Sequence, residues 1–103
     1  MPTTLKKIQR LEQYLATDSS MVDPVLDSTI DKLLARERSK MLELKLRLEE
    51  QRKTFETKYA QSSAAFYANY EKGEMGDEMD YLEWASTIEM LAKLENHLAL
   101  LDT

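Results

Sequence analysis

Helix-breaking residues are scarce in this chain and confined to a few places. Glycine and proline each occur only twice in 103 residues, as Pro2, Pro24, Gly73 and Gly76. Because these two residue types interrupt helices most strongly, the long stretch between Pro24 and Gly73 contains no strong breaker. No alternation of apolar and polar residues is long enough to indicate a strand. The sequence therefore predicts an all-α fold.

Apolar spacing and capping residues predict four helices within a single helical domain spanning residues 1–103. The expected ranges are residues 4–16 (a short N-terminal helix), 23–59 (a long helix), 62–72 (a short aromatic helix) and 77–101 (the C-terminal helix). Asp23 and Asp77 are expected to cap the helices that follow them, and Gly73 is placed like the glycine that ends a helix. We expect the last helix to pack antiparallel on the long one, as a long-helix hairpin or coiled-coil-like bundle.

The long predicted helix carries an apolar stripe whose members step by three, four and seven residues. The stripe consists of Ile30, Leu34, Met41, Leu44, Leu48 and Phe55. A helix of this length, about 50 Å at 1.5 Å per residue, is typical of a coiled coil, a hairpin or an oligomer. Leu33, Leu42 and Leu46 widen the apolar face beyond what two helices of unequal length can cover. We therefore expect the stripe to be the seam of a homo-oligomer, with a dimer favoured, or of a complex with a different chain.

Composition excludes several kinds of site. The chain has no cysteine and one histidine, His97, which has no nucleophile or acid at a defined spacing. We therefore predict no catalytic residues, no cofactor and no metal ligands, and a protein that is not an enzyme. No apolar run approaches the roughly 18 residues of a membrane span, and the first residues lack the apolar core of a signal peptide. These features predict a cytoplasmic chain with no membrane partner.

The charge of the chain argues against nucleic acid and is unevenly distributed. The net charge is −5, and the basic residues of the long helix are interleaved with acidic ones rather than forming one stripe. Up to Lys58 there are 12 basic and 10 acidic residues, whereas from Tyr59 onward there are 2 basic and 9 acidic. The acidic part is suited to attract a basic partner, or it only solvates helix faces and complements the basic part of the chain.

The densest carboxylate cluster consists of Glu74, Asp77, Glu78, Asp80 and Glu83. Carboxylates bind divalent cations, but the spacing does not match a calcium-binding EF-hand loop. Favourable placement of negative charge at a helix start is the simpler interpretation.

Aromatic residues gather in the same part of the chain. Seven of them are Phe55, Tyr59, Phe66, Tyr67, Tyr70, Tyr81 and Trp84. They form either a compact core, where the short aromatic helix folds against its neighbours, or anchors of a binding surface. The pattern favours the core and leaves room for one or two rings to face outward.

The same segment resembles the C-terminal part of small helical prokaryotic proteins that accompany toxin genes as antitoxin components. The resemblance lies in Phe55, Lys58-Tyr59, Ser62, Phe66, Tyr70, Gly73-Glu74, Gly76-Asp77, Asp80 and Glu83-Trp84, and covers residues 55–84. Ala60-Gln61 departs from the glycine expected after Lys-Tyr. The resemblance implies a cytoplasmic binding protein that neutralises a partner.

The sequence thus predicts a non-catalytic protein–protein interaction module, antitoxin-like, that binds a basic toxin. The residues predicted to bind the partner are Phe66, Tyr70, Glu74, Asp77, Asp80, Tyr81, Glu83 and Trp84. The alternative is a self-assembling coiled-coil scaffold with no toxin partner.

Overall fold

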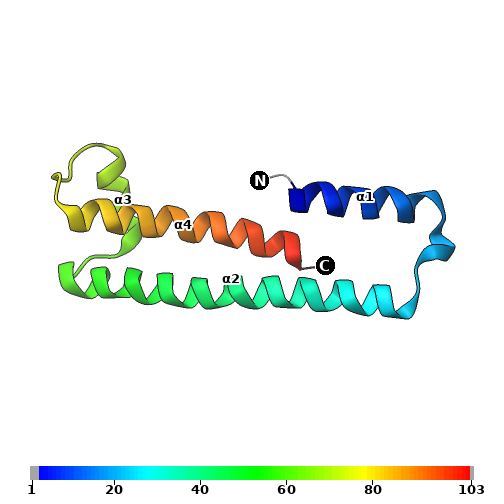
Figure 1. The fold of residues 1–103 in the computed structure, drawn as a ribbon. Coiled ribbons are helices and arrows are strands. Elements are labelled where there is room, and N and C mark those ends of the chain that lie inside the picture. The colour runs from blue at the N-terminus through cyan, green and yellow to red at the C-terminus, as the bar shows by residue number, and fades with distance from the viewer. Residues whose placement is uncertain (1–2, 103) are drawn as a thin grey trace. The chain divides into compact units, whose positions relative to one another are not determined.

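The computed structural model of the chain describes residues 3–102, and its only regular elements over that range are helices. Its elements are α1 (Thr3–Thr17), the 3₁₀ turn η1 (Ser19–Met21), α2 (Pro24–Tyr59), α3 (Ser63–Glu71) and α4 (Met79–Leu101) (Figure 1). The predicted all-α class is confirmed, and no strand occurs among these residues.

The chain divides into two compact units. The N-terminal unit is Met1–Ala35 and the C-terminal unit is Arg36–Thr103, so the boundary falls within α2. That both belong to one domain remains a prediction. The units are described separately below.

The N-terminal unit consists of α1, η1 and the first part of α2. The helix α1 ends at Thr17, close to the predicted end at residue 16, and Asp18 then caps η1 by accepting a 2.9 Å hydrogen bond from the Ser20 N–H. This bond lowers the pKa of Asp18. Asp23 then caps α2, its Oδ1 accepting the Leu26 N–H at 2.7 Å, which confirms the predicted helix start.

In the C-terminal unit, α4 runs antiparallel to the second part of α2 (Figure 1). Two ion pairs mark the ends of this hairpin: Arg38 Nε lies 2.6 Å from Asp102 Oδ1, and Lys58 Nζ lies 2.6 Å from Asp80 Oδ2. Between them Leu48 packs against α4 in a small aliphatic cluster. The predicted antiparallel hairpin is therefore present.

Several members of the predicted oligomer seam are used within the chain. Leu48 and Phe55 are buried in the two core clusters, and Met41 and Leu44 pack against the aliphatic one. These four residues are covered wholly or partly by α4 and do not form a free seam. The physical reason is that α4 is long enough to reach back to Arg38, so it occupies the stripe that the sequence assigns to a second chain.

The two turns around α3 end their helices in the same way. Gly73, with φ of 73°, donates to the Tyr70 carbonyl at 3.0 Å, while the Glu74 N–H donates to the Asn69 carbonyl at 3.0 Å. This pair of bonds is the Schellman motif, and the predicted role of Gly73 is confirmed. Ala60, with φ of 50°, ends α2 by the equivalent pair of bonds, although it carries a Cβ.

The start of α4 differs from the prediction. Asp77 does not cap the helix; Glu78 occupies the N-cap position and makes no side-chain capping bond. Its carbonyl accepts from the N–H groups of Tyr81 and Leu82, so the first turn begins after Glu78. Asp80, in that turn, binds side chains of α2, and this contact holds the turn in place.

Candidate functional site

An aromatic core joins the end of α2, the helix α3 and the start of α4. Phe66 of α3 and Trp84 of α4 are completely buried, and their rings stack with centroids 3.9 Å apart and planes 3° apart. Phe55 of α2 also stacks on Trp84, with the ring centroids 5.8 Å apart. The aromatic segment therefore forms the compact core that the sequence pattern favours.

The only polar atom of the Trp84 ring is satisfied inside this core. Its Nε1–H donates to Ser63 Oγ at 2.9 Å, and the Ser63 N–H donates in turn to Glu56 Oε2 at 3.0 Å. Hydrogen bonding from the side chain and the backbone of Ser63 lowers the pKa of Glu56. Because a buried indole N–H without a partner is costly, these contacts fix α3 against both α2 and α4. The predicted helix over residues 62–72 contains Ser63, but its contact with Trp84 was not predicted from the sequence.

Asp80 joins the start of α4 to the end of α2. Its Oδ2 accepts hydrogen bonds from Lys58 Nζ, at 2.6 Å, and from the Tyr59 hydroxyl. The Lys58 and Tyr59 bonds lower the pKa of Asp80, and the pKa values of Lys58 and Tyr59 are both raised by the bond to Asp80. The Asp80 carboxylate is thus already bonded to Lys58 and Tyr59 of its own chain.

Two of the eight residues predicted to bind a partner are placed differently by the structure. Phe66 and Trp84 are 0% exposed, so neither reaches the surface. The two rings cover each other, and Phe55 covers Trp84 further, so the prediction that Phe66 and Trp84 contact a partner is wrong. Tyr70 and Tyr81 lie partly buried at the edge of the same core.

The other predicted residues lie on the outside of this core. Glu74, Asp77 and Glu83 are exposed, as are two carboxylates that the prediction left out, Glu71 and Glu78. We call these five residues the acidic surface. Within residues 3–102 none of the five forms a salt bridge. Large apolar side chains stand among them, since Met79 is 69% exposed and Leu82 is 46% exposed.

A shallow groove runs along one side of the α2 and α4 pair and ends at the acidic surface. One part, of about 330 Å³, is lined by Met41, Leu44, Leu48, Met90 and Leu94 together with Lys93 and His97. The next part, of about 410 Å³, again includes Leu48 and Met90 and continues to Leu82 and Glu83. We call this continuous depression the α2–α4 groove. Its methionines are flexible, polarizable side chains that adapt to an apolar partner.

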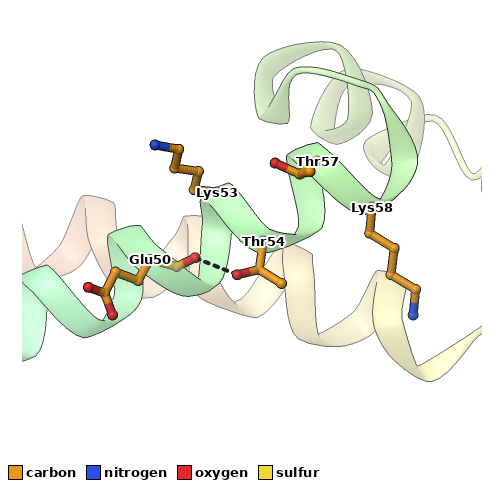
Figure 2. Close-up of a pocket in the computed structure, with 5 residues that line it drawn as sticks. All are labelled: Glu50, Lys53, Thr54, Thr57 and Lys58. Atoms are coloured by element: carbon orange, nitrogen blue, oxygen red, sulfur yellow. Dashed lines mark hydrogen bonds between the residues drawn. The ribbon is translucent and has the colours of Figure 1, made fainter.

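Another hollow of the surface lies elsewhere and has no converging chemical groups. It covers about 600 Å³ and is lined by residues of α2 alone (Glu50, Lys53, Thr54, Thr57 and Lys58). Figure 2 shows the two lysine side chains pointing away from each other and Thr54 bonded to its own helix, through the Glu50 carbonyl at 2.9 Å. This hollow is the open side of one helix.

Residues 3–102 were compared with the requirements of a metal site and of a membrane span. No group of three or more histidine, cysteine, aspartate or glutamate side chains is arranged to hold a metal ion in that range. No helix in the same range combines the length and the apolar character needed to cross a bilayer.

No protein-family model, curated protein or solved structure matches this chain. The resemblance of residues 55–84 to antitoxin components therefore remains a prediction. The arguments that follow rest on the chain's own geometry.

Proposed function

We propose that the chain is a non-catalytic protein-binding module that neutralises a basic partner protein, in the manner of an antitoxin. The observation that carries this proposal is the acidic surface: five exposed carboxylates, none paired within residues 3–102, around the exposed side chains of Met79 and Leu82. Unpaired carboxylates attract a basic partner over several ångströms and orient it.

The α2–α4 groove supplies the apolar part of the contact. Binding energy at protein interfaces comes mainly from a few apolar anchors in pockets, while charged rims contribute to specificity and association rate. Met90 and Leu82 are each 46% exposed in the groove, beside the carboxylate of Glu83. An amphipathic helix with basic flanks is the partner segment that fits such a groove.

The underlying core makes this surface rigid before any partner binds. Phe66 and Trp84 are fully buried, and Asp80 ties the first turn of α4 to α2. Because little ordering is needed on binding, more of the contact energy appears as affinity. This supports a pre-formed binding surface.

The experiment is co-expression with the product of the neighbouring gene, followed by co-purification and a growth assay. The test variant replaces three carboxylates of the acidic surface by amides (Glu74→Gln, Asp77→Asn and Glu83→Gln). The matched control removes the same charge from exposed positions elsewhere (Glu12→Gln, Glu43→Gln and Glu50→Gln). We expect the first variant to bind at least about tenfold more weakly and lose growth rescue, with the control unchanged.

Two results would overturn the proposal. One is a neighbouring product that neither binds the chain nor inhibits growth in its absence. The other is an equal loss of binding in both triple variants. Binding would then depend on the net charge of the chain and not on the acidic surface. The alternative, a self-assembling scaffold without a toxin partner, is favoured by the exposed apolar residues of the N-terminal unit.

A further inference from the structure

The N-terminal unit has no core of its own. None of residues 3–35 is buried, and only Leu15, Leu26 and Ile30 are even half-buried. Yet α1 has a clear apolar stripe (Leu5, Ile8, Leu11 and Leu15), and the first part of α2 has another (Leu26, Ile30, Leu33 and Leu34). A 15-residue helix is marginal in water without packing, so α1 needs a surface to cover its stripe.

We infer that a second copy of this chain covers these two stripes, in a two-fold dimer of N-terminal units. This inference does not depend on the proposed function, because the acidic surface and the α2–α4 groove belong to the C-terminal unit. It also relocates the predicted seam. Of its six residues, Ile30 and Leu34 remain in the dimer contact, whereas Leu48 and Phe55 are buried in the core.

The apolar area available matches what a dimer needs. Burying one large aliphatic side chain removes roughly 60–120 Å² of apolar surface from water. The eight side chains of the two stripes, partly accessible, offer roughly 200–400 Å² per copy, and four others of the same unit (Tyr14, Met21, Val22 and Val25) bring the total to on the order of 350–700 Å². A standard-size protein–protein interface buries about 800 Å² per partner, of which somewhat more than half is apolar.

The N-terminal unit carries basic residues in α1 and acidic residues in residues 18–31. This separation of charges indicates that the partner is a second copy of the chain. The α1 helix carries Lys6, Lys7 and Arg10 against one acidic residue, Glu12. Residues 18–31 carry four aspartates and no basic residue. None of these basic residues or aspartates forms a salt bridge within residues 3–102. A surface that presents both signs in separate places suits a copy of itself better than a uniformly basic or acidic partner.

The first test is the mass of the purified full chain by light scattering, with no partner present. We expect twice the chain mass of 12.0 kDa for the wild type. Ile30→Glu and Leu11→Glu should each weaken the dimer by about tenfold or more, because a charge then enters the apolar contact. The control Leu100→Glu, at a residue 83% exposed on α4, should stay dimeric.

Trp84 separates loss of the dimer from loss of folding. It is the only tryptophan and lies in the core of the C-terminal unit, so its fluorescence reports that core alone. We expect native Trp84 emission in all three variants. A monomeric wild type would overturn the inference, whether α1 packs elsewhere in its own chain or stays open. A dimer that withstands both glutamate substitutions would overturn it as well.

The second test asks whether the charge contacts join two copies. Lys6→Glu/Arg10→Glu and Asp27→Lys/Asp31→Lys each make α1 and the start of α2 repel, so each double variant alone should dimerise weakly. Mixing the two variants should restore association, because each α1 then meets an oppositely charged α2 of the other copy. A mixture no stronger than its components would contradict the arrangement.

Discussion

The indole ring of Trp84 lies parallel to the phenyl ring of Phe66, with their centroids 3.9 Å apart. One ring belongs to α4 and the other to α3, and Phe55 of α2 also stacks on Trp84. All three helices of the C-terminal unit therefore meet at one point. The stability of this end of the molecule depends on that contact and on the few polar bonds around it.

Ser63→Ala should destabilise the chain by about 1–3 kcal/mol, because it leaves the buried Trp84 Nε1–H without an acceptor. The measurement is urea unfolding followed by Trp84 fluorescence. Ser86→Ala, at an exposed position of α4, is the control and should change stability by about 0.5 kcal/mol or less. If both variants unfold at the same urea concentration, the Ser63 bond does not stabilise the core.

Ala60→Gly should stabilise the chain by about 0.5–1 kcal/mol. Ala60 has φ of 50°, a left-handed conformation in which a Cβ is unfavourable and glycine is not. Ala64→Gly, within α3, should have the opposite effect by a similar amount, because glycine is a poor helix residue. Thermal unfolding of both variants checks the pair. A lower melting temperature for Ala60→Gly would contradict the structure of this turn.

Asp80→Asn should destabilise the chain at neutral pH and make little difference in strong acid. The hydrogen bonds from Lys58 and Tyr59 lower the pKa of Asp80 below its usual 3.8. Because the folded pKa is the lower one, the stabilisation is present above pH 3.8 and is lost as the pH falls through the folded pKa. Urea unfolding of wild type and variant across this range measures the difference. Asp77→Asn is the control. If Asp80→Asn remains less stable than wild type in strong acid, the ionised Asp80 carboxylate is not the source of the stabilisation.

The hydroxyl of Tyr67 should lose its proton only at an unusually high pH. Its hydroxyl donates to Glu89 Oε2 at 2.7 Å, and this bond is the main cause that raises the pKa of Tyr67 to about 12. The stabilisation it gives is present below the usual pKa of 10.0 and is lost as the pH rises through about 12. Phenolate absorbance of wild type and Tyr67→Phe isolates this titration. In Glu89→Gln it should move toward 10.0, and an unchanged titration would show that the bond is absent.

The helices and the core were predictable because they depend on local pattern. Breaker positions, the Asp23 cap and the Gly73 turn are properties of a few adjacent residues, and they were predicted where the structure has them. The aromatic core followed from seven rings in one segment, which can hardly all stay in water.

The pairing of individual side chains was not predictable in the same way. Ser63 and Trp84 are 21 residues apart, and Asp80 reaches Lys58 across two helices. Such contacts require the register of α4 on α2, which an apolar stripe alone leaves open. For the same reason Phe66 and Trp84 were assigned to a partner surface, although the structure buries both.

The central claim is that the C-terminal unit is complete by itself, whereas the N-terminal unit is completed by a second copy. Hydrogen exchange of the full chain at several protein concentrations tests it most directly. We predict that amides of α1 and of residues 24–35 lose protection on dilution, while those of α4 keep theirs at every concentration. Protection of α1 that is the same at all concentrations would contradict the claim.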